Sequence, residues 1–114
     1  MTVEPIGLEV RRRGPGEVSL RLSGELGLGC LGWLEEALEE GLCGARRVLV
    51  DASAITFIDG ACLALLAAAR LRHPGRVSLE AASYQLRLAA AACGLEEWLG
   101  IVPLPAPGLR EVPR

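Results

Sequence analysis

Apolar and polar residues alternate in two short stretches near the start of the chain, at residues 6–12 and 17–23. Successive side chains of a β-strand point to opposite faces, so this period of two predicts a strand in each stretch. The Gly-Pro-Gly sequence at 14–16 between them is typical of a tight turn. The first part of the chain is therefore predicted to be a β-hairpin.

The pattern then changes to helical spacing. Leucines recur at 31, 34, 38 and 42, with four glutamates at 35, 36, 39 and 40 on the other side. This spacing predicts one amphipathic helix, which we expect Gly41 or Gly44 to end. The apolar run that follows, at 46–51, predicts a strand of the kind covered on both faces, with Asp51 at its end.

The second half of the chain alternates between helical and strand-like patterns. Residues 61–72 predict a helix that is apolar nearly all round, and such a helix is buried or contacts a partner. Residues 76–81 predict a strand, and the next helix has Ser83 as its expected N-cap and Gly94 as its stop. Residues 95–104 predict a helical turn and a last short strand.

These elements give the order β-β-α-β-α-β-α-(β), which predicts a single small α/β domain with a mixed sheet and helices packed on it. The strand, helix and strand within 46–81 form a crossover unit, which requires parallel strands and a right-handed connection. A chain of 114 residues has room for one such domain. We expect it to span residues 1–104, followed by a loose Pro-rich tail at 105–114.

Charge and composition narrow the function classes. The net charge is −2 and the arginines are scattered, apart from a run at 11–13 that we assign to a solvated hairpin tip. No basic face for a phosphate backbone is predicted, so we expect no nucleic-acid partner. No apolar stretch is long enough for a membrane span and the N-terminus lacks a signal pattern, so a soluble, cytoplasmic protein is expected.

Cofactor and metal sites are not predicted. The four cysteines lie far apart and form no Cys-x-x-Cys pair, which indicates reduced and mostly buried thiols, with no zinc site and no disulfide framework. Gly27, Gly29 and Gly32 fit a dinucleotide-binding spacing between a strand and a helix. The chain is short for such a domain and lacks the acidic residue expected to close a second strand, so we expect no cofactor.

Candidate catalytic groups are few. The single histidine, His73, lies in a predicted loop far in sequence from any Ser or Cys nucleophile, so the chain is not expected to be an enzyme. Asp51 and Asp59, the only aspartates, are placed by the pattern near the same edge of the sheet, but Asp59 has a local explanation as a helix N-cap. Cys62, in the first turn of that helix, is either a thiol with a lowered pKa or, as we favour, a buried apolar side chain.

Three segments together are similar to a STAS domain, the family of bacterial anti-sigma factor antagonists and of the cytoplasmic tails of sulfate transporters. They read "VSLRLSGELG", "RRVLVDASAITFIDGACLALLAAAR" and "YQLRLAAAACGLEEWLGIVPL". The resemblance covers residues 6–104 in the family's order and spacing. It implies a mixed sheet with helices packed on it, in agreement with the order above.

The resemblance is uneven at the positions that carry function. The matching positions are 23–26, Asp51, Ser53, Phe57, Asp59, Leu63 and 94–95. Gly27 stands where the family usually has Asp, and Gly60, Ala61 and Cys62 replace Ser, Ser and Gly. In phosphoswitch members the second Ser accepts a phosphate from an anti-sigma kinase, and the phosphate breaks the complex with that kinase. Ala61 occupies that position and has no hydroxyl, while Ser53 and Thr56 lie nearby but do not match it.

The resemblance implies a non-enzymatic regulatory domain of the anti-sigma factor antagonist type, acting in transcription control by partner switching and locked in its unphosphorylated, binding state. It would dock the helix that begins near Ala61 and a loop at 24–28 onto an anti-sigma factor/serine kinase, with Leu63, Leu66 and Ala67 as an exposed apolar centre. The partner-binding residues so predicted are Gly24, Glu25, Leu28, Ser53, Thr56, Asp59, Gly60, Ala61, Cys62, Leu63 and Leu66.

Two alternatives stay open at this point. A stand-alone STAS subunit of a membrane transport system, binding a transporter ATPase or permease, would not need a phosphoacceptor at Ala61. A small redox-sensing module that uses Cys62 predicts a thiol that alkylates quickly near neutral pH. A homodimer is compatible with each of these hypotheses.

Overall fold

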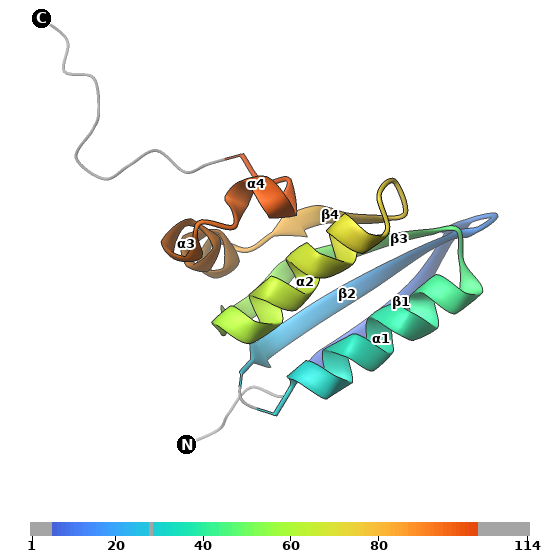
Figure 1. The fold of residues 1–114 in the computed structure, drawn as a ribbon. Coiled ribbons are helices and arrows are strands. Elements are labelled where there is room, and N and C mark those ends of the chain that lie inside the picture. The colour runs from blue at the N-terminus through green and yellow to red at the C-terminus, as the bar shows by residue number, and fades with distance from the viewer. Residues whose placement is uncertain (1–5, 28, 103–114) are drawn as a thin grey trace, which may run out of the picture.

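A computed structural model describes residues 6–27 and 29–102 (Figure 1). The elements in chain order are β1 (Gly7–Gly14), β2 (Glu17–Leu26), α1 (Leu31–Gly44), β3 (Arg47–Ile58), α2 (Gly60–Arg72), β4 (Val77–Ala82), α3 (Tyr84–Cys93) and α4 (Glu96–Leu99). This order confirms the predicted small α/β domain. The last strand that was expected after α4 does not form at 100–102, and the proposed tail at 105–114 lies outside the described residues.

The sheet has four strands in the order β1-β2-β3-β4, so β1 and β4 are its edges. The pair β1 and β2 is antiparallel, while β3 runs parallel to both β2 and β4. Two right-handed crossovers that move across the sheet in the same direction place their helices on the same face. Figure 1 shows α1 and α2 side by side on that face, with α3 and α4 beside the β4 edge.

The core lies between the sheet and this helical layer. The central strands β2 and β3 and the helices α1, α2 and α3 each contribute at least one fully buried side chain, among them Leu22, Val48, Leu34, Leu63 and Leu86. Burying a leucine side chain contributes roughly 1.5–3 kcal/mol relative to leaving it exposed. The burial of these leucine side chains, more than the helix propensity of the sequence, therefore holds α1 and α2 against the sheet.

Strand β3 is longer than the sequence pattern predicted, because it continues past Asp51 to Ile58. Its pairing with β2 shifts register twice, between Arg21 and Ser23 and between Gly24 and Glu25. Each irregularity bends the strand without ending it, which is the usual effect of a β-bulge. The expectation that this strand is covered by elements on both faces is also wrong, since the helices lie on one face only (Figure 1).

The opposite face of the sheet is largely polar. Arg13 in β1 reaches across it to pair with Glu80 in β4, with 3.0 Å between nitrogen and oxygen, and Arg11 pairs with Glu9 at 2.6 Å. The arginine run at 11–13 is exposed, as predicted for this end of the hairpin. Exposed ion pairs of this kind contribute little to stability, so this face is mainly solvated surface.

The ends of α3 follow the sequence signals. The Ser83 hydroxyl accepts a hydrogen bond from the Leu86 N–H at 3.1 Å, and Gly94 adopts a left-handed conformation with φ of 69°. A left-handed residue after the last turn lets the chain leave the helix while its N–H still bonds to a helical carbonyl. Both predicted caps are confirmed.

Within the described residues, none of the helices has the length and apolarity required to cross a membrane.

Candidate partner-binding site

The site is built around the N-terminus of α2, where Asp59 caps the helix. Its backbone is extended, with φ of −86° and ψ of 169°, and its Oδ1 atom accepts a hydrogen bond from the Cys62 N–H at 2.8 Å. This bond satisfies one of the N–H groups that a helix start leaves without a partner inside the helix. The predicted capping role of Asp59 is confirmed, and the cap fixes the direction in which α2 leaves the sheet.

The end of strand β2 is joined to this cap. The Asp59 N–H donates to the Leu26 carbonyl at 3.0 Å, and Leu26 pairs with Ile58 at the last position of the ladder. Gly24, which was expected in a loop, is a buried strand residue with φ of 86°, a conformation that suits glycine. The expected loop at 24–28 is thus wrong for Gly24, Glu25 and Leu26, and Leu28 lies outside the described residues.

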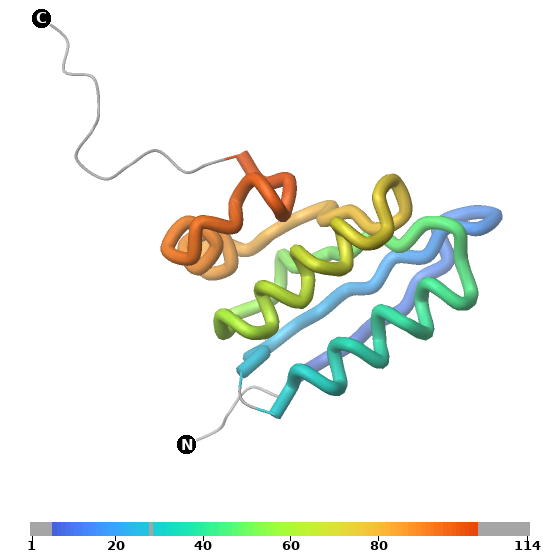
Figure 2. Tube along the Cα trace, viewed as in Figure 1, coloured from blue at the N-terminus to red at the C-terminus, as the bar shows by residue number. Residues whose placement is uncertain are grey.

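The exposed surface at this end combines the helix start with two strand residues. Gly60 and Ala61 are exposed, and Glu25 pairs across the strands with Phe57, whose side chain is 49% exposed. A β-carbon added at Gly27 would lie 3.4 Å from the Phe57 ring, an ordinary van der Waals distance, so the ring packs beside the chain at this position. Figure 2 shows that α1 and α2 both begin at this end of the sheet, opposite the β-hairpin turn.

Three residues that were expected to form the exposed apolar centre lie in the core instead. Leu63 is fully buried, Leu66 is 3% exposed and Ala67 is 4% exposed. The reason is the central place of α2, which packs against α1, α3, α4 and β4 and turns Leu63 and Leu66 inward. A helix that is apolar nearly all round gives no signal of which face is buried. Phe57 is instead a large apolar side chain that the structure leaves exposed at this end. Its match to the family pattern had given no indication of that exposure.

Ala61 lies at the second position of α2 with its side chain open to solvent. A β-carbon added at the neighbouring Gly60 would meet nothing within 4 Å, so the surroundings of the helix start are open. A methyl group cannot accept a phosphate, which adds about −2 charge where it is attached. Thr56 and Ser53 are exposed on β3, but neither belongs to the helix start.

The Cys62 side chain is fully buried below the helix start. Burial, followed by a hydrogen bond to Asp59 and the charge of that carboxylate, raises the pKa of the thiol to about 12. A thiol with this pKa stays protonated at neutral pH, and the thiolate is the nucleophile. The hypothesis of a reactive Cys62 is therefore wrong. The expectation of mostly buried thiols is also wrong, because Cys43 and Cys93 are exposed and Cys30 is half-buried.

Alkylation of the native protein near neutral pH is expected to proceed first at Cys43 and Cys93 and last at Cys62, because only exposed thiols meet the reagent. Peptide mass spectrometry of a time course with iodoacetamide measures the order. A denatured sample is the control, in which all sites react at similar rates. Rapid labelling of native Cys62 would contradict both its burial and its raised pKa.

Asp51 and Ser53 form a local hydrogen-bonded pair within β3. Asp51 Oδ1 accepts from the Ser53 hydroxyl at 2.7 Å and from the Ser53 N–H at 3.0 Å. Burial alone raises the pKa of Asp51, but the two Ser53 hydrogen bonds and the charges of Arg21 and Arg13 outweigh it and lower the pKa below 3.8. Asp51 lies in mid-strand, eight residues before Asp59, so the expected neighbourhood of two carboxylates at one sheet edge is wrong.

The lowered pKa of Asp51 predicts a pH dependence of folding stability. Because the folded state binds this proton less tightly than the unfolded state, the contribution of Asp51 is present above pH 3.8 and is lost as the pH falls below it. Urea unfolding between about pH 5 and about pH 3 should therefore show a shallower loss of stability in Asp51→Asn than in wild type. Identical slopes in the two proteins would contradict this assignment, and Ser53→Ala should fall between them.

Removing the helix cap is expected to destabilise the fold. Asp59→Ala should lower the free energy of unfolding by about 1 kcal/mol, and by up to about 2, because the Cys62 N–H loses its acceptor. Asp59→Asn should lower it less, since an amide oxygen can still accept that bond. Urea denaturation of the three proteins measures the effect. Equal stability of Asp59→Ala and wild type would show that the cap contributes nothing.

Within the described residues, no group of three or more His, Cys, Asp or Glu side chains is arranged to hold a metal ion. The candidate site consists of a capped helix start, a half-exposed aromatic ring and one exposed carboxylate.

Comparison with known proteins identifies the family. The chain matches the family described as "Mlab, STAS domain" over residues 10–103, which is most of its length. The protein therefore belongs to the STAS domain family, as the sequence segments had indicated. A comparison with curated protein sequences found no match.

Two solved structures are similar in fold. An anti-sigma factor antagonist from Mycobacterium paratuberculosis has a TM-score of 0.72 and 21% sequence identity, covering 90% of this chain and 92% of its own. The anti-sigma factor antagonist SpoIIAA in its unphosphorylated form has a TM-score of 0.65 and 18% identity, covering 87% of this chain and 89% of its own. At these identities the likeness establishes the shared fold.

Proposed function

We propose that this protein is a non-enzymatic interaction domain of the anti-sigma factor antagonist type, which binds an anti-sigma factor/serine kinase through the start of α2. The observation that carries the proposal is the exposed, capped helix N-terminus with Ala61 at its second position. The proposed contact surface consists of Glu25, Phe57, Gly60 and Ala61. The names of the two structures with the same fold support the choice of partner class.

Ala61 defines how this protein differs from a phosphorylated switch. A phosphate on a side chain here would bring about −2 charge into a close interface, where charge that finds no partner opposes binding. The methyl group of Ala61 cannot be modified in this way. We therefore propose that the protein stays permanently in its binding state and that its control lies in its amount or in its partner.

The experiment is an affinity capture from native lysate with wild type and Ala61→Glu side by side, with captured proteins identified by mass spectrometry. Capture of a serine-kinase anti-sigma factor by wild type alone is the expected result. The direct interaction is then measured with the purified partner. Recovery of the same kinase by both proteins would contradict docking through Ala61.

A second candidate function rests on the same residue. A subunit of a membrane transport system that binds a transporter ATPase or permease needs no phosphoacceptor, and Ala61 is equally compatible with that role. The capture experiment separates the two functions, since recovery of a transporter component would replace the sigma-factor proposal. Neighbouring genes for sigma-factor regulators or for transporter proteins provide an independent test.

A further inference from the structure

Helix α3 carries an apolar row of side chains on its solvent side. Its other side packs into the core through Leu86 and Ala90. On the solvent side Tyr84 is 63% exposed, Leu88 is 46% exposed and Ala91 is also exposed. Residues three and four apart are neighbours on one face of a helix, so these three side chains form a continuous row, which we call the α3 row.

The α3 row has the composition of a contact surface. The solvent side of α1 carries four exposed glutamates, at 35, 36, 39 and 40, whereas the single charged residue of α3 is Arg87. Helices at a protein surface usually present polar side chains to water, and a contiguous apolar patch there marks a place of contact. Aromatic residues and a low content of charge are typical of the centre of such contacts.

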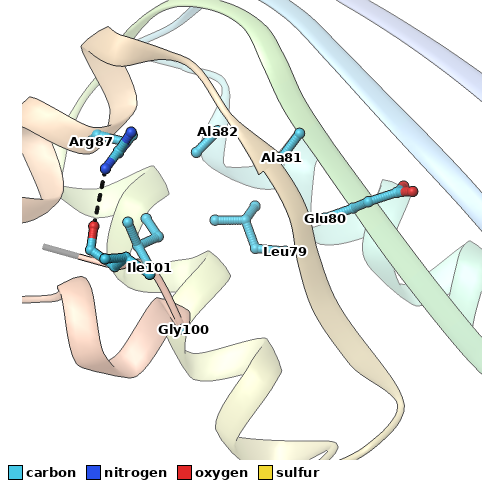
Figure 3. Close-up of a pocket in the computed structure, with 8 residues that line it drawn as sticks. Leu79, Glu80, Ala81, Ala82, Arg87, Gly100 and Ile101 are labelled. Atoms are coloured by element: carbon cyan, nitrogen blue, oxygen red, sulfur yellow. Dashed lines mark hydrogen bonds between the residues drawn. The ribbon is translucent and has the colours of Figure 1, made fainter.

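The described chain ends beside the α3 row, at the solvent-open pocket drawn in Figure 3. The Nη2 atom of Arg87 donates to the Val102 carbonyl at 3.1 Å, as the dashed line shows. Arg87 lies three residues after Tyr84 and four before Ala91, so it borders the α3 row. Residues 103–114 therefore continue from a point next to that row.

The sequence after Val102 reads "PLPAPGLREVPR", in which four of twelve residues are proline. Such a composition favours the polyproline II helix, which has three residues per turn. At this spacing one face of the segment is entirely apolar, and its three charged residues lie on the other faces. The apolar face consists of Pro103, Ala106, Leu109 and Val112.

The dimensions of this segment match those of α3. A polyproline II helix rises about 3.1 Å per residue, so residues 103–112 span roughly 30 Å. The ten residues of α3 span about 15 Å, so the segment can follow the whole helix. Successive residues of its apolar face are about 9 Å apart, and Tyr84 and Ala91 are about 10 Å apart along the helix axis.

We propose that the C-terminal segment of this chain docks on the α3 row, with Pro103, Ala106 and Leu109 facing Tyr84 and Leu88. The segment then takes the place of the loose tail expected from composition. Proline-rich segments bind aromatic surfaces in this manner, because a polyproline II helix loses little conformational entropy on binding. A tether of a few residues gives an effective concentration in the mM range, so an intrinsic Kd of about 1 mM is sufficient for docking.

This contact goes beyond the proposed function and is independent of it. Its residues belong to α3 and to the segment after α4, and none of them is among the proposed contact residues around Ala61. Failure of one proposal therefore leaves the other unaffected.

The first test is NMR of the full chain, in which Tyr84 is the single tyrosine, so its ring protons are identified without ambiguity. Nuclear Overhauser effects are expected between this ring and the side chains of Pro103 or Ala106. The proposal is overturned if the ring shows none to residues 103–112, or if the segment instead contacts residues 79–82 at the β4 edge. A mixture of isotope-labelled and unlabelled chains identifies contacts between copies, and contacts found only between copies also overturn it.

A matched pair of variants tests the α3 side of the contact. Leu88→Ser removes an apolar side chain from the α3 row, and Leu71→Ser removes one of similar exposure, 53%, from α2. Trypsin cleavage after Arg110 follows the population in which the segment is released. Cleavage there should be at least about fivefold faster in Leu88→Ser than in wild type and unchanged in Leu71→Ser. Equal rates in Leu88→Ser and wild type would overturn the proposal.

A second pair of variants changes the segment and leaves every core side chain of the described domain in place. Leu109→Ser alters the apolar face of the segment, whereas Leu104→Ser alters a leucine outside that face. The Overhauser effects between Tyr84 and the segment should be lost in the first variant and kept in the second. Unchanged effects in Leu109→Ser would contradict docking through this face.

Discussion

Ala61→Glu is expected to weaken binding of the partner kinase at least about 100-fold, which corresponds to roughly 3 kcal/mol. The side chain at this position is exposed at the start of α2, so a carboxylate there would enter the proposed interface. A charge buried in an interface without a partner costs several kcal/mol. Isothermal calorimetry or biolayer interferometry with the purified kinase measures the change.

Two controls show whether Ala61→Glu weakens binding through its charge or through a loss of folding stability or added bulk. An acidic residue near a helix N-terminus is favourable by about 0.3–1 kcal/mol, so the variant should unfold no more easily than wild type. Ala61→Gln adds similar bulk without charge and should lose much less affinity than Ala61→Glu. If Ala61→Glu binds as tightly as wild type, the start of α2 is not in the interface. Equal losses in the two variants would indicate a steric effect rather than charge.

Leu63→Ala is expected to lower the free energy of unfolding by about 3 kcal/mol, within the range of about 2–5 for fully buried leucines. Leu63 lies on the buried face of α2 and is fully buried in the core. Removing most of its side chain leaves a cavity that the packed neighbours only partly fill. Urea denaturation gives the stability change. The affinity of the remaining folded protein for its partner should be close to that of wild type, since Leu63 does not reach the surface.

Phe57→Ala is the matched comparison, because it removes an apolar side chain that is 49% exposed. We expect it to lower stability by only about 1 kcal/mol, since about half of the ring is already in water. Its affinity for the partner should fall about tenfold or more, as is usual for an aromatic residue in an interface. The reverse result, with affinity lost in Leu63→Ala and kept in Phe57→Ala, would place the interface elsewhere.

Local sequence signals were sufficient to predict features in which a residue interacts with residues next to it in the chain. Asp59 and Ser83 were identified as caps because a short polar side chain before a helix has one main use there, and the structure confirms both. Gly94 was identified as a helix stop for the same kind of reason. The element order followed from periodicity, and the right-handed crossover then determined the parallel part of the sheet.

Features that depend on contacts between residues far apart in the chain could not be predicted from the sequence pattern. Strand β3 passes Asp51 because that carboxylate bonds to Ser53 within the strand and because β2 pairs alongside as far as Ile58. The burial of Leu63 and Leu66 follows from the helices that surround α2, and an almost uniformly apolar helix shows no preferred face, although the favoured interpretation of Cys62 as a buried side chain is confirmed.

The composition of strand β1 has a consequence for behaviour in concentrated solution. This strand forms an exposed edge of the sheet, where free backbone groups can template pairing with another molecule. Charged side chains on an edge strand oppose such pairing, and β1 carries Glu9 and the arginines 11–13, two of which form ion pairs with Glu9 and Glu80. The edge is thus protected against sheet-to-sheet aggregation by its charged side chains, and high salt, which screens charges, would weaken that protection.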